Sequence, residues 1–136
     1  MKKIYLIIIL GIVMMSSTCG GDRDDCHRNI KIINNSDKTV RLYGSLNYPD
    51  SISDFGTKYT LYTIRPHSDY LDYSRSCREA MIPYQNKHGV LMYFLIDDAV
   101  LKSTPMDTII KYRMYLKQYN LTVEGLKNSN WTVTYP

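Results

Sequence analysis

Cys77 and His88 form the best catalytic pair that this sequence offers, a thiol nucleophile with an imidazole base. Arg75 and Arg78 flank the cysteine, and nearby positive charge favours the thiolate, which is the reactive form of the side chain. No signature of a cysteine enzyme surrounds Cys77, and the sequence contains no glycine-rich phosphate loop, serine elbow or HExxH motif. We therefore expect a protein without catalytic residues, with an enzyme acting on glycans or peptides as the alternative.

The histidines and acidic residues show no spacing that is typical of a metal site. His27, His67 and His88 are scattered along the chain, and no two of them lie one helical turn apart. Asp97 and Asp98 are adjacent, but two carboxylates at the end of a strand are usually solvated. We therefore predict neither a metal site nor a cofactor.

The first 19 residues have the order of a secretory signal. Lys2 and Lys3 supply positive charge, residues 4–15 form an apolar stretch, and three small polar residues lead to Cys19. At 1.5 Å per residue, a helix over this stretch reaches only about 18 Å, whereas the hydrocarbon core of a bilayer is about 30 Å thick. The segment is therefore predicted to direct export and not to span the membrane.

The residues before Cys19 resemble the lipobox of bacterial lipoproteins, since small residues precede a cysteine at the end of a signal core. This resemblance implies cleavage before Cys19 and attachment of lipid to that residue. Two or three acyl chains would then anchor the protein stably, because a single chain holds only marginally. The alternative is an ordinary signal peptide that is cut near Ser17 or Thr18.

A short polar tether follows the predicted lipidation site. Residues 20–25 read GGDRDD and contain no apolar side chain to bury, which is typical of a flexible linker. Asp22, Asp24 and Asp25 also resemble the surface-export signal of Bacteroidetes lipoproteins. We predict a signal peptide at 1–18, a lipidated tether at 19–28 and one domain at 29–136, held at the outer membrane and displayed on the cell surface.

Export also bears on the charge and on the other cysteines. Residues 19–136 carry 15 basic and 13 acidic side chains, a net charge of +2 that is too weak to predict nucleic acid as a partner. Cys26 and Cys77 remain after lipidation of Cys19, and an even pair in an exported chain favours a disulfide. Two free thiols are the alternative.

Short segments of alternating or β-branched residues dominate the remainder of the chain. They predict strands at residues 29–33, 39–46, 59–64, 68–74, 89–96, 115–120 and 131–135. The turn residues at 34–37 predict a hairpin between the first two segments. The run at 89–96 is apolar throughout, which is typical of a central strand, whereas 68–74 is polar and suits a sheet edge.

Helical signals are few and short. Residues 75–83 lack alternation and predict one helical turn, and Pro105 fits the first position of a helix over 105–112. Thr122 is placed to cap a helical turn through Lys127. Together with the strands, these signals predict a mainly β fold, a small immunoglobulin-like β-sandwich with one or two short helices.

Several segments are similar to those of small Bacteroidetes lipoproteins of unknown function. The similarity lies in residues 26–28, 34–37 and 48–50, and at the C-terminus in 119–122 and 130–136. It implies a surface-anchored β-sandwich-like domain and brings no known activity with it.

The 13 tyrosines are the remaining compositional feature. Tyrosine suits half-buried pleated surfaces, so most of these rings are expected in sheet packing. Tyr59, Tyr62, Tyr70 and Tyr73 lie in polar surroundings and are our candidates for a face that binds a glycan or a protein.

Two three-residue motifs are candidate sites of glycosylation. Asp50-Ser51-Ile52 and Asp107-Thr108-Ile109 resemble the O-glycosylation acceptor of Bacteroidetes, which makes Ser51 and Thr108 candidate sites.

The function that we expect is binding or organisation of the envelope, with the membrane as a partner through the lipid anchor. A subunit of a surface assembly joined by strand addition is a further alternative.

Overall fold

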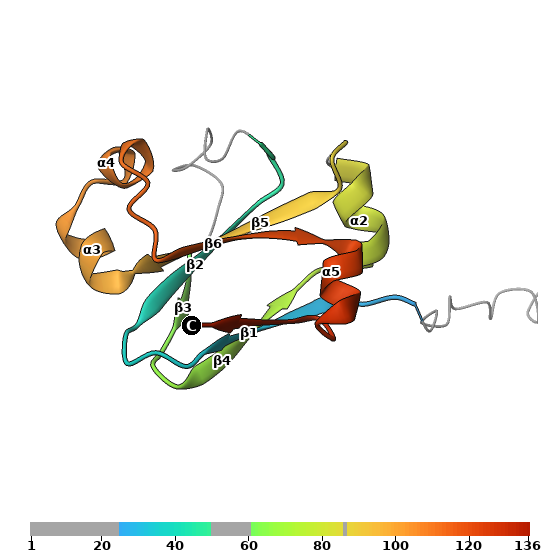
Figure 1. The fold of residues 1–136 in the computed structure, drawn as a ribbon, viewed down its shortest axis with the longest axis horizontal. Coiled ribbons are helices and arrows are strands. Elements are labelled where there is room, and N and C mark those ends of the chain that lie inside the picture. Colours follow the sequence, from blue (N-terminus) through green and yellow to red (C-terminus); the bar gives the residue numbers. More distant parts are fainter. Residues whose placement is uncertain (1–24, 50–60, 86) are drawn as a thin grey trace, which may run out of the picture.

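The computed structural model describes residues 25–49, 61–85 and 87–136. In this part of the chain seven strands form two sheets, and the protein is a small, mainly β sandwich, as the sequence predicts (Figure 1). Four short helices lie at the ends of the sheets, with α2 and α5 at one end and α3 and α4 at the other.

The smaller sheet has the strand order β4-β1-β7. Its members are β1 (Asn29–Asn34), β4 (Ser68–Tyr73) and β7 (Thr132–Tyr135). The central strand β1 runs antiparallel to β4 and parallel to β7. The polar segment predicted at a sheet edge is β4, which does lie at the edge of this sheet.

The larger sheet has the order β3-β2-β5-β6, with neighbouring strands antiparallel. It contains β2 (Val40–Ser45), β3 (Tyr62–Ile64), β5 (Val90–Asp97) and β6 (Lys117–Thr122). Every residue of β5 except Asp97 is buried. This burial on both faces explains the continuous apolar run and confirms the predicted interior position of the strand.

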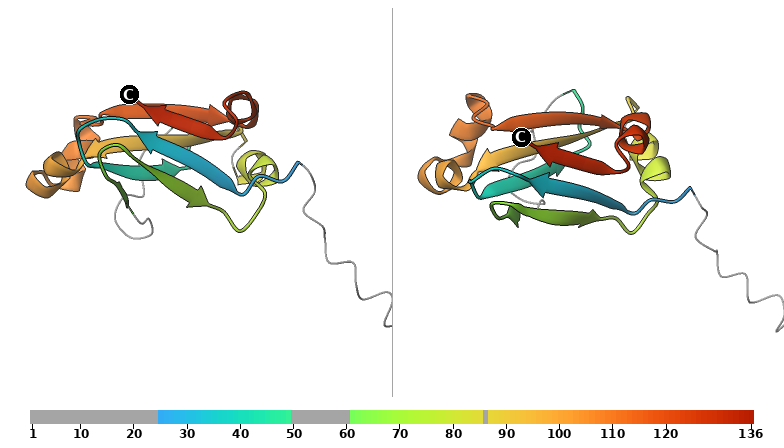
Figure 2. Two further views of the ribbon diagram at one scale, coloured as in Figure 1. Left: turned by 90° about the horizontal axis from the view of Figure 1, so that it is seen from below. Right: turned by 60° about the horizontal axis from the view of Figure 1, so that its bottom comes forward.

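The predicted hairpin between the first two strands is wrong. β1 and β2 belong to different sheets, and the segment between them crosses from one sheet to the other (Figure 2). The buried side chain of Asn34 supports this crossing, because its amide nitrogen donates to the carbonyls of Lys38 and Arg65 at 2.8 and 2.9 Å. A turn cluster in the sequence therefore marks a change of sheet here.

The helices are more numerous than the one or two that the sequence predicts. They are α2 (Arg78–Gln85), α3 (Asp98–Ser103), α4 (Met106–Lys111) and α5 (Val123–Asn128). The Thr122 hydroxyl caps α5 by accepting from the Gly125 amide at 3.1 Å, as predicted, whereas α4 begins one residue after Pro105. Within the described residues, no helix has the length and apolar character needed to cross a membrane.

Two apolar clusters hold the fold together. The larger lies between the sheets and includes Ile32, Leu42, Leu95 and Val133. The smaller lies on the other face of the larger sheet, where Phe94 contacts residues that include Ile110 of α4. Both faces of β2 and β5 are therefore covered, and the tyrosines at 43 and 93 serve as packing residues with 1% exposure.

Candidate functional site

Two of the four candidate ligand-face tyrosines stack on each other. Tyr62 of β3 and Tyr70 of β4 have ring centroids 4.7 Å apart and planes 27° apart, so they join the edges of the two sheets. Burial raises the pKa of the Tyr70 phenol, and the neighbouring Tyr62 adds to the shift. Tyr73 lies at the end of β4 with 61% of its surface exposed, and Tyr59 lies outside the described residues.

A cleft of about 400 Å³ opens beside these rings. It lies between the edge strands β3 and β4, the interior strands β2 and β5, and the beginning of α2. Tyr62 and Tyr73 contribute aromatic surface, and the apolar part of the wall comes from Leu42, Leu46 and Met81. Tyr70 does not line the cleft, and it contacts Tyr62 by stacking on its ring.

A buried ion pair forms the polar part of the cleft wall. The Arg78 side chain is 6% exposed, and its Nη2 donates to Asp72 Oδ2 at 2.8 Å and to the Asp72 carbonyl at 3.1 Å. The Asp72 carbonyl faces β1, where Asp72 pairs with Ile30, so Arg78 fixes the end of β4 on the paired side of this strand. Arg78 Nε is buried and has no hydrogen-bond partner within the described part of the chain.

Tyr93 completes this polar group from β5. Its hydroxyl donates a short hydrogen bond to Asp72 Oδ2. Burial, reinforced by the negative charge of Asp72, raises the pKa of the Tyr93 phenol well above its usual value, so the hydroxyl keeps its proton. Gly44 lies opposite Tyr93 in the sheet, and a Cβ at this position would be only 3.2 Å from Tyr93 Cε1. Glycine at 44 therefore leaves room for the ring beside the cleft.

The cleft offers three kinds of contact to a ligand. Asp72 Oδ1 accepts no hydrogen bond from the described residues and remains available as an acceptor. Arg75, at the mouth, is exposed and supplies a cation. Tyr62 and Tyr73 supply flat apolar faces. A few polar groups among aromatic and apolar side chains are the usual composition of a small-molecule site.

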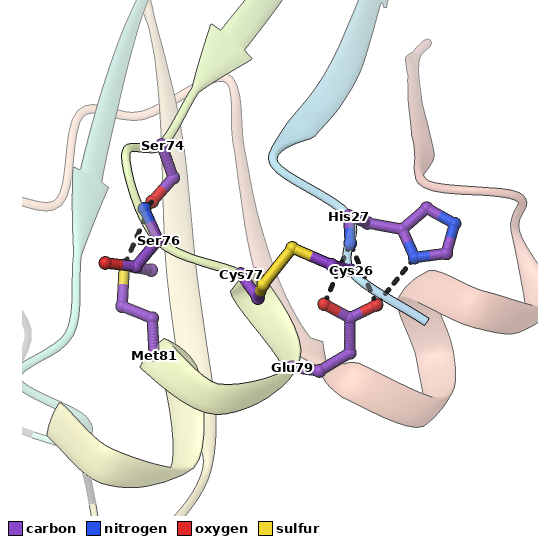
Figure 3. The surroundings of a disulfide bond; sticks show 7 residues. All are labelled: Cys26, His27, Ser74, Ser76, Cys77, Glu79 and Met81. Carbon is purple, nitrogen blue, oxygen red and sulfur yellow. Dashed lines mark hydrogen bonds and ion pairs between the residues drawn. A yellow bond between two sulfur atoms is a disulfide. The ribbon is translucent and has the colours of Figure 1, made fainter. Parts of the chain in front are cut away.

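The predicted disulfide is confirmed, and it lies close to the first residues of α2 (Figure 3). Cys26 and Cys77 are bonded with their Cα atoms 4.9 Å apart, within the usual range for a bridge. Cys77 is therefore not a free thiol, and the nucleophile considered with His88 does not exist in this structure. His88 instead lies edge-on to the ring of Tyr48, with centroids 5.6 Å apart.

His27 and Glu79 form a second connection beside the bridge (Figure 3). The imidazole Nδ1 donates to Glu79 Oε1 at 2.6 Å, and the backbone amide of His27 donates to Oε2 at 3.0 Å. Burial by itself would raise the pKa of Glu79, but the hydrogen bonds from His27 outweigh it, so the pKa lies below its usual value. These contacts fix the beginning of β1 to α2.

The acidic pair at the junction of β5 and α3 is fully engaged by basic side chains. Asp97 contacts Lys38 at 2.9 Å, and Asp98 contacts Arg41 at 2.6 Å and Lys102 at 2.7 Å. Asp97 also caps α3 by accepting from the Ala99 amide at 2.9 Å. These carboxylates hold α3 against the sheet. In the ranges that the structure describes, no group of three or more metal-ligating residues occurs.

The other predicted site residues are only partly described. Cys19, Asp22, Asp24 and Ser51 lie outside the described residues. Asp25 is exposed and directly precedes the disulfide. Thr108 lies within α4 and is half-buried, next to the fully buried Ile109.

The most buried polar residues of the cleft were not recognised from sequence as ligand-binding candidates. Alternation along β4 turns Tyr70 and Asp72 inward, and an inward carboxylate requires a partner. Arg78 is that partner, but it lies on a helix, and sequence spacing alone does not bring the two together. The aromatic residues around them were the signal that pointed to this edge of the sheet.

Comparison with known proteins adds no relative. No family model matches the chain, and neither a curated protein nor a solved structure matches it. The function is therefore inferred from the sequence and from the geometry of the cleft.

Proposed function

We propose that the protein is a non-catalytic, lipid-anchored binding protein of the outer membrane surface, and that the cleft beside Asp72 and Arg78 binds a saccharide. The observation that carries this proposal is the grouping of two exposed tyrosines around a fixed carboxylate in one cleft of about 400 Å³. A pyranose ring has a face of C–H groups that packs on an aromatic ring, and hydroxyls that donate to a carboxylate.

The side chains that line the cleft favour a saccharide over an extended peptide. A peptide that adds a strand binds through free backbone groups along a sheet edge. The cleft instead presents the Asp72 carboxylate and the rings of Tyr62 and Tyr73. A ligand in this cleft is therefore expected to bind through side chains, which suits a sugar.

The role of Asp72 in the cleft favours binding over chemistry. Its Oδ2 atom accepts from both Arg78 and Tyr93, which fixes the orientation of the carboxylate. Such preorganisation lowers the entropic cost of binding a hydroxyl at Oδ1. This arrangement supports a positioning acceptor, which is what recognition of a sugar hydroxyl requires.

The proposed anchor rests on the sequence of the first 25 residues. The signal core followed by Cys19 supports lipidation, and the polar residues up to the disulfide at Cys26 leave a tether between lipid and domain. Asp22, Asp24 and Asp25 support display on the outer leaflet. Protease added to intact cells should remove the domain, and replacing the three aspartates with Ala should protect it. Equal digestion of both forms would contradict the sorting role.

A panel of immobilised glycans and peptides tests the binding role. Full-length protein in detergent should bind at least one glycan, and the double variant Tyr62→Ala/Tyr73→Ala should lose that binding. Tyr112→Ala is the matched control, because Tyr112 is 65% exposed and does not line the cleft. Binding to peptides alone, or glycan binding that the double variant retains, would contradict the proposal.

A second candidate function is assembly through strand addition, and one observation favours it. The edge strands β6 and β7 flank a groove of about 270 Å³ that is lined in part by Leu121 and Val133. The Tyr119 hydroxyl donates to the Thr134 carbonyl across this groove at 2.7 Å, so an added strand would have to displace that bond. Cross-linking on intact cells should give a ladder of higher mass if the groove mediates assembly, and a monomer alone would contradict it.

A further inference from the structure

We propose that the saccharide bound in the cleft carries a carboxylate, as a uronic acid does, and that Arg75 and Arg78 recognise this group. The inference rests on the proposed function, since it names the chemical class of the ligand for the same cleft. Three observations carry it: the charge that is left at the mouth, the surplus of donors on Arg78, and the geometry of the remaining acceptor.

The charged side chains that line the cleft carry a net positive charge. Asp72 and Arg78 neutralise each other through their 2.8 Å ion pair. Arg75 lines the same cleft, is exposed, and forms no ion pair with any residue in the described ranges. A cation at the mouth of a cleft whose other described charges cancel attracts an anionic ligand and draws its charged group toward the two arginines.

Arg78 has more hydrogen-bond donors than the protein satisfies. A guanidinium carries five N–H donors. The side-chain hydrogen bonds that Arg78 gives to described residues both come from Nη2, and Nε is buried without a partner in that part of the chain. An unsatisfied buried donor is costly, because it has lost water without gaining an acceptor. A carboxylate that enters the cleft brings acceptor oxygens toward the guanidinium of Arg78, and Arg75 adds a second cation beside it.

The remaining acceptor distinguishes an acidic sugar from an acidic peptide. Asp72 Oδ1 is free among the described residues and requires a donor such as a ring hydroxyl. The flat faces of Tyr62 and Tyr73 require an apolar surface that lies against them. A uronic acid offers hydroxyls, a C–H face and one carboxylate within a single ring. An acidic peptide offers charge, but a peptide added as a strand binds through its backbone and leaves these side-chain contacts unused.

Titration calorimetry on the full-length protein in detergent tests the inference, with glucuronate, glucose and triglutamate as probes. Glucuronate should bind roughly fivefold more tightly than glucose, the effect expected of one exposed charge contact. Arg75→Gln should remove this preference, so that glucuronate and glucose bind the variant equally well. Arg113→Gln, a matched loss of an exposed arginine that does not line the cleft, should retain it. Higher salt should weaken the binding of glucuronate and not that of glucose.

The possible failures are distinguishable. Equal affinity for glucuronate and glucose, with both lost in Tyr73→Ala, would overturn the carboxylate inference and leave the proposed function standing. Binding of neither sugar, or sugar binding that Tyr73→Ala does not affect, would overturn the proposed function. Binding of triglutamate as tight as that of glucuronate would show that the cleft recognises acidic peptides, which also contradicts the inference.

Discussion

The imidazole of His27 lies flat on the indole of Trp131, with ring centroids 4.5 Å apart and planes 13° apart. His27 precedes β1, and Trp131 precedes β7, which is the parallel neighbour of β1. The Lys31 amide also donates to the Trp131 carbonyl at 2.9 Å. The beginnings of the first and last strands are therefore fastened together, next to the disulfide and the helix that carries Arg78.

Glu79→Gln should destabilise the protein at neutral pH by about 1.5–3 kcal/mol, the usual contribution of hydrogen bonds to a charged group. Hydrogen bonds from His27 hold the pKa of Glu79 below its ordinary value of 4.5. The contribution of Glu79 is therefore present above that value and is lost as the pH falls through the lowered pKa. The difference between the two proteins, measured by urea unfolding, should be largest near pH 7 and vanish in acid.

Glu124→Gln is the matched control, because Glu124 is the one other glutamate of the chain and is exposed. It should change the free energy of unfolding by less than about 0.5 kcal/mol. A difference between wild type and Glu79→Gln that grows below pH 4.5 would show that the His27 contacts do not stabilise the ionised carboxylate.

Replacing both Cys26 and Cys77 with Ser should lower the free energy of unfolding by about 2–5 kcal/mol. The bridge spans 51 residues, so its loss frees a long loop in the unfolded chain. Urea unfolding in the absence of reductant measures the effect. Reaction of the two cysteines of the unreduced protein with a thiol reagent would contradict the bridge.

Asn34→Ala should destabilise the protein by about 2–4 kcal/mol. The amide nitrogen of Asn34 donates to the carbonyls of Lys38 and Arg65, and the variant loses both hydrogen bonds. The Asn34 side chain is fully buried, and its loss removes the donor from two partly buried carbonyls. Asn35→Ala is the control, since the neighbouring side chain is exposed. Equal thermal stability of the two variants would refute the role given to the Asn34 amide.

Cys19→Ala should release the protein from the membrane fraction and lower its mass by the attached lipid. The expectation follows from the signal core and the small residues before Cys19. Cell fractionation and mass spectrometry of the intact protein measure both effects. Unchanged membrane association and mass would refute lipidation at this position.

The parts of the fold that depend on local pattern could be predicted from sequence. β5 was recognisable because burial on both faces leaves a continuous apolar run. The Thr122 cap of α5 was recognisable because its signal lies within three residues. The pairing of β1 could not be recognised from sequence. Its partners are β4 and β7, and no local signal specifies such distant neighbours.

Some residues of the candidate site could also be predicted from local pattern, and others could not. Tyr62, Tyr70 and Tyr73 could be selected because aromatic residues in polar segments are unusual. The Asp72–Arg78 pair could not, because the charged group that turns inward finds its partner only through the folded geometry. α3 was also missed, since Asp97 and Asp98 mark the end of a strand in the sequence and cap or begin a helix in the structure.

Methyl NMR of the native protein tests the cleft most directly. Met81 lines the cleft, whereas Met114 is 39% exposed and lies outside it. With methionine methyls labelled and Met81 assigned through Met81→Leu, titration with glucuronate and then with glucose should shift the Met81 signal saturably and leave Met114 unchanged. An unchanged Met81 signal at saturating sugar, or an equal shift of both methyls, would contradict a saccharide site in this cleft.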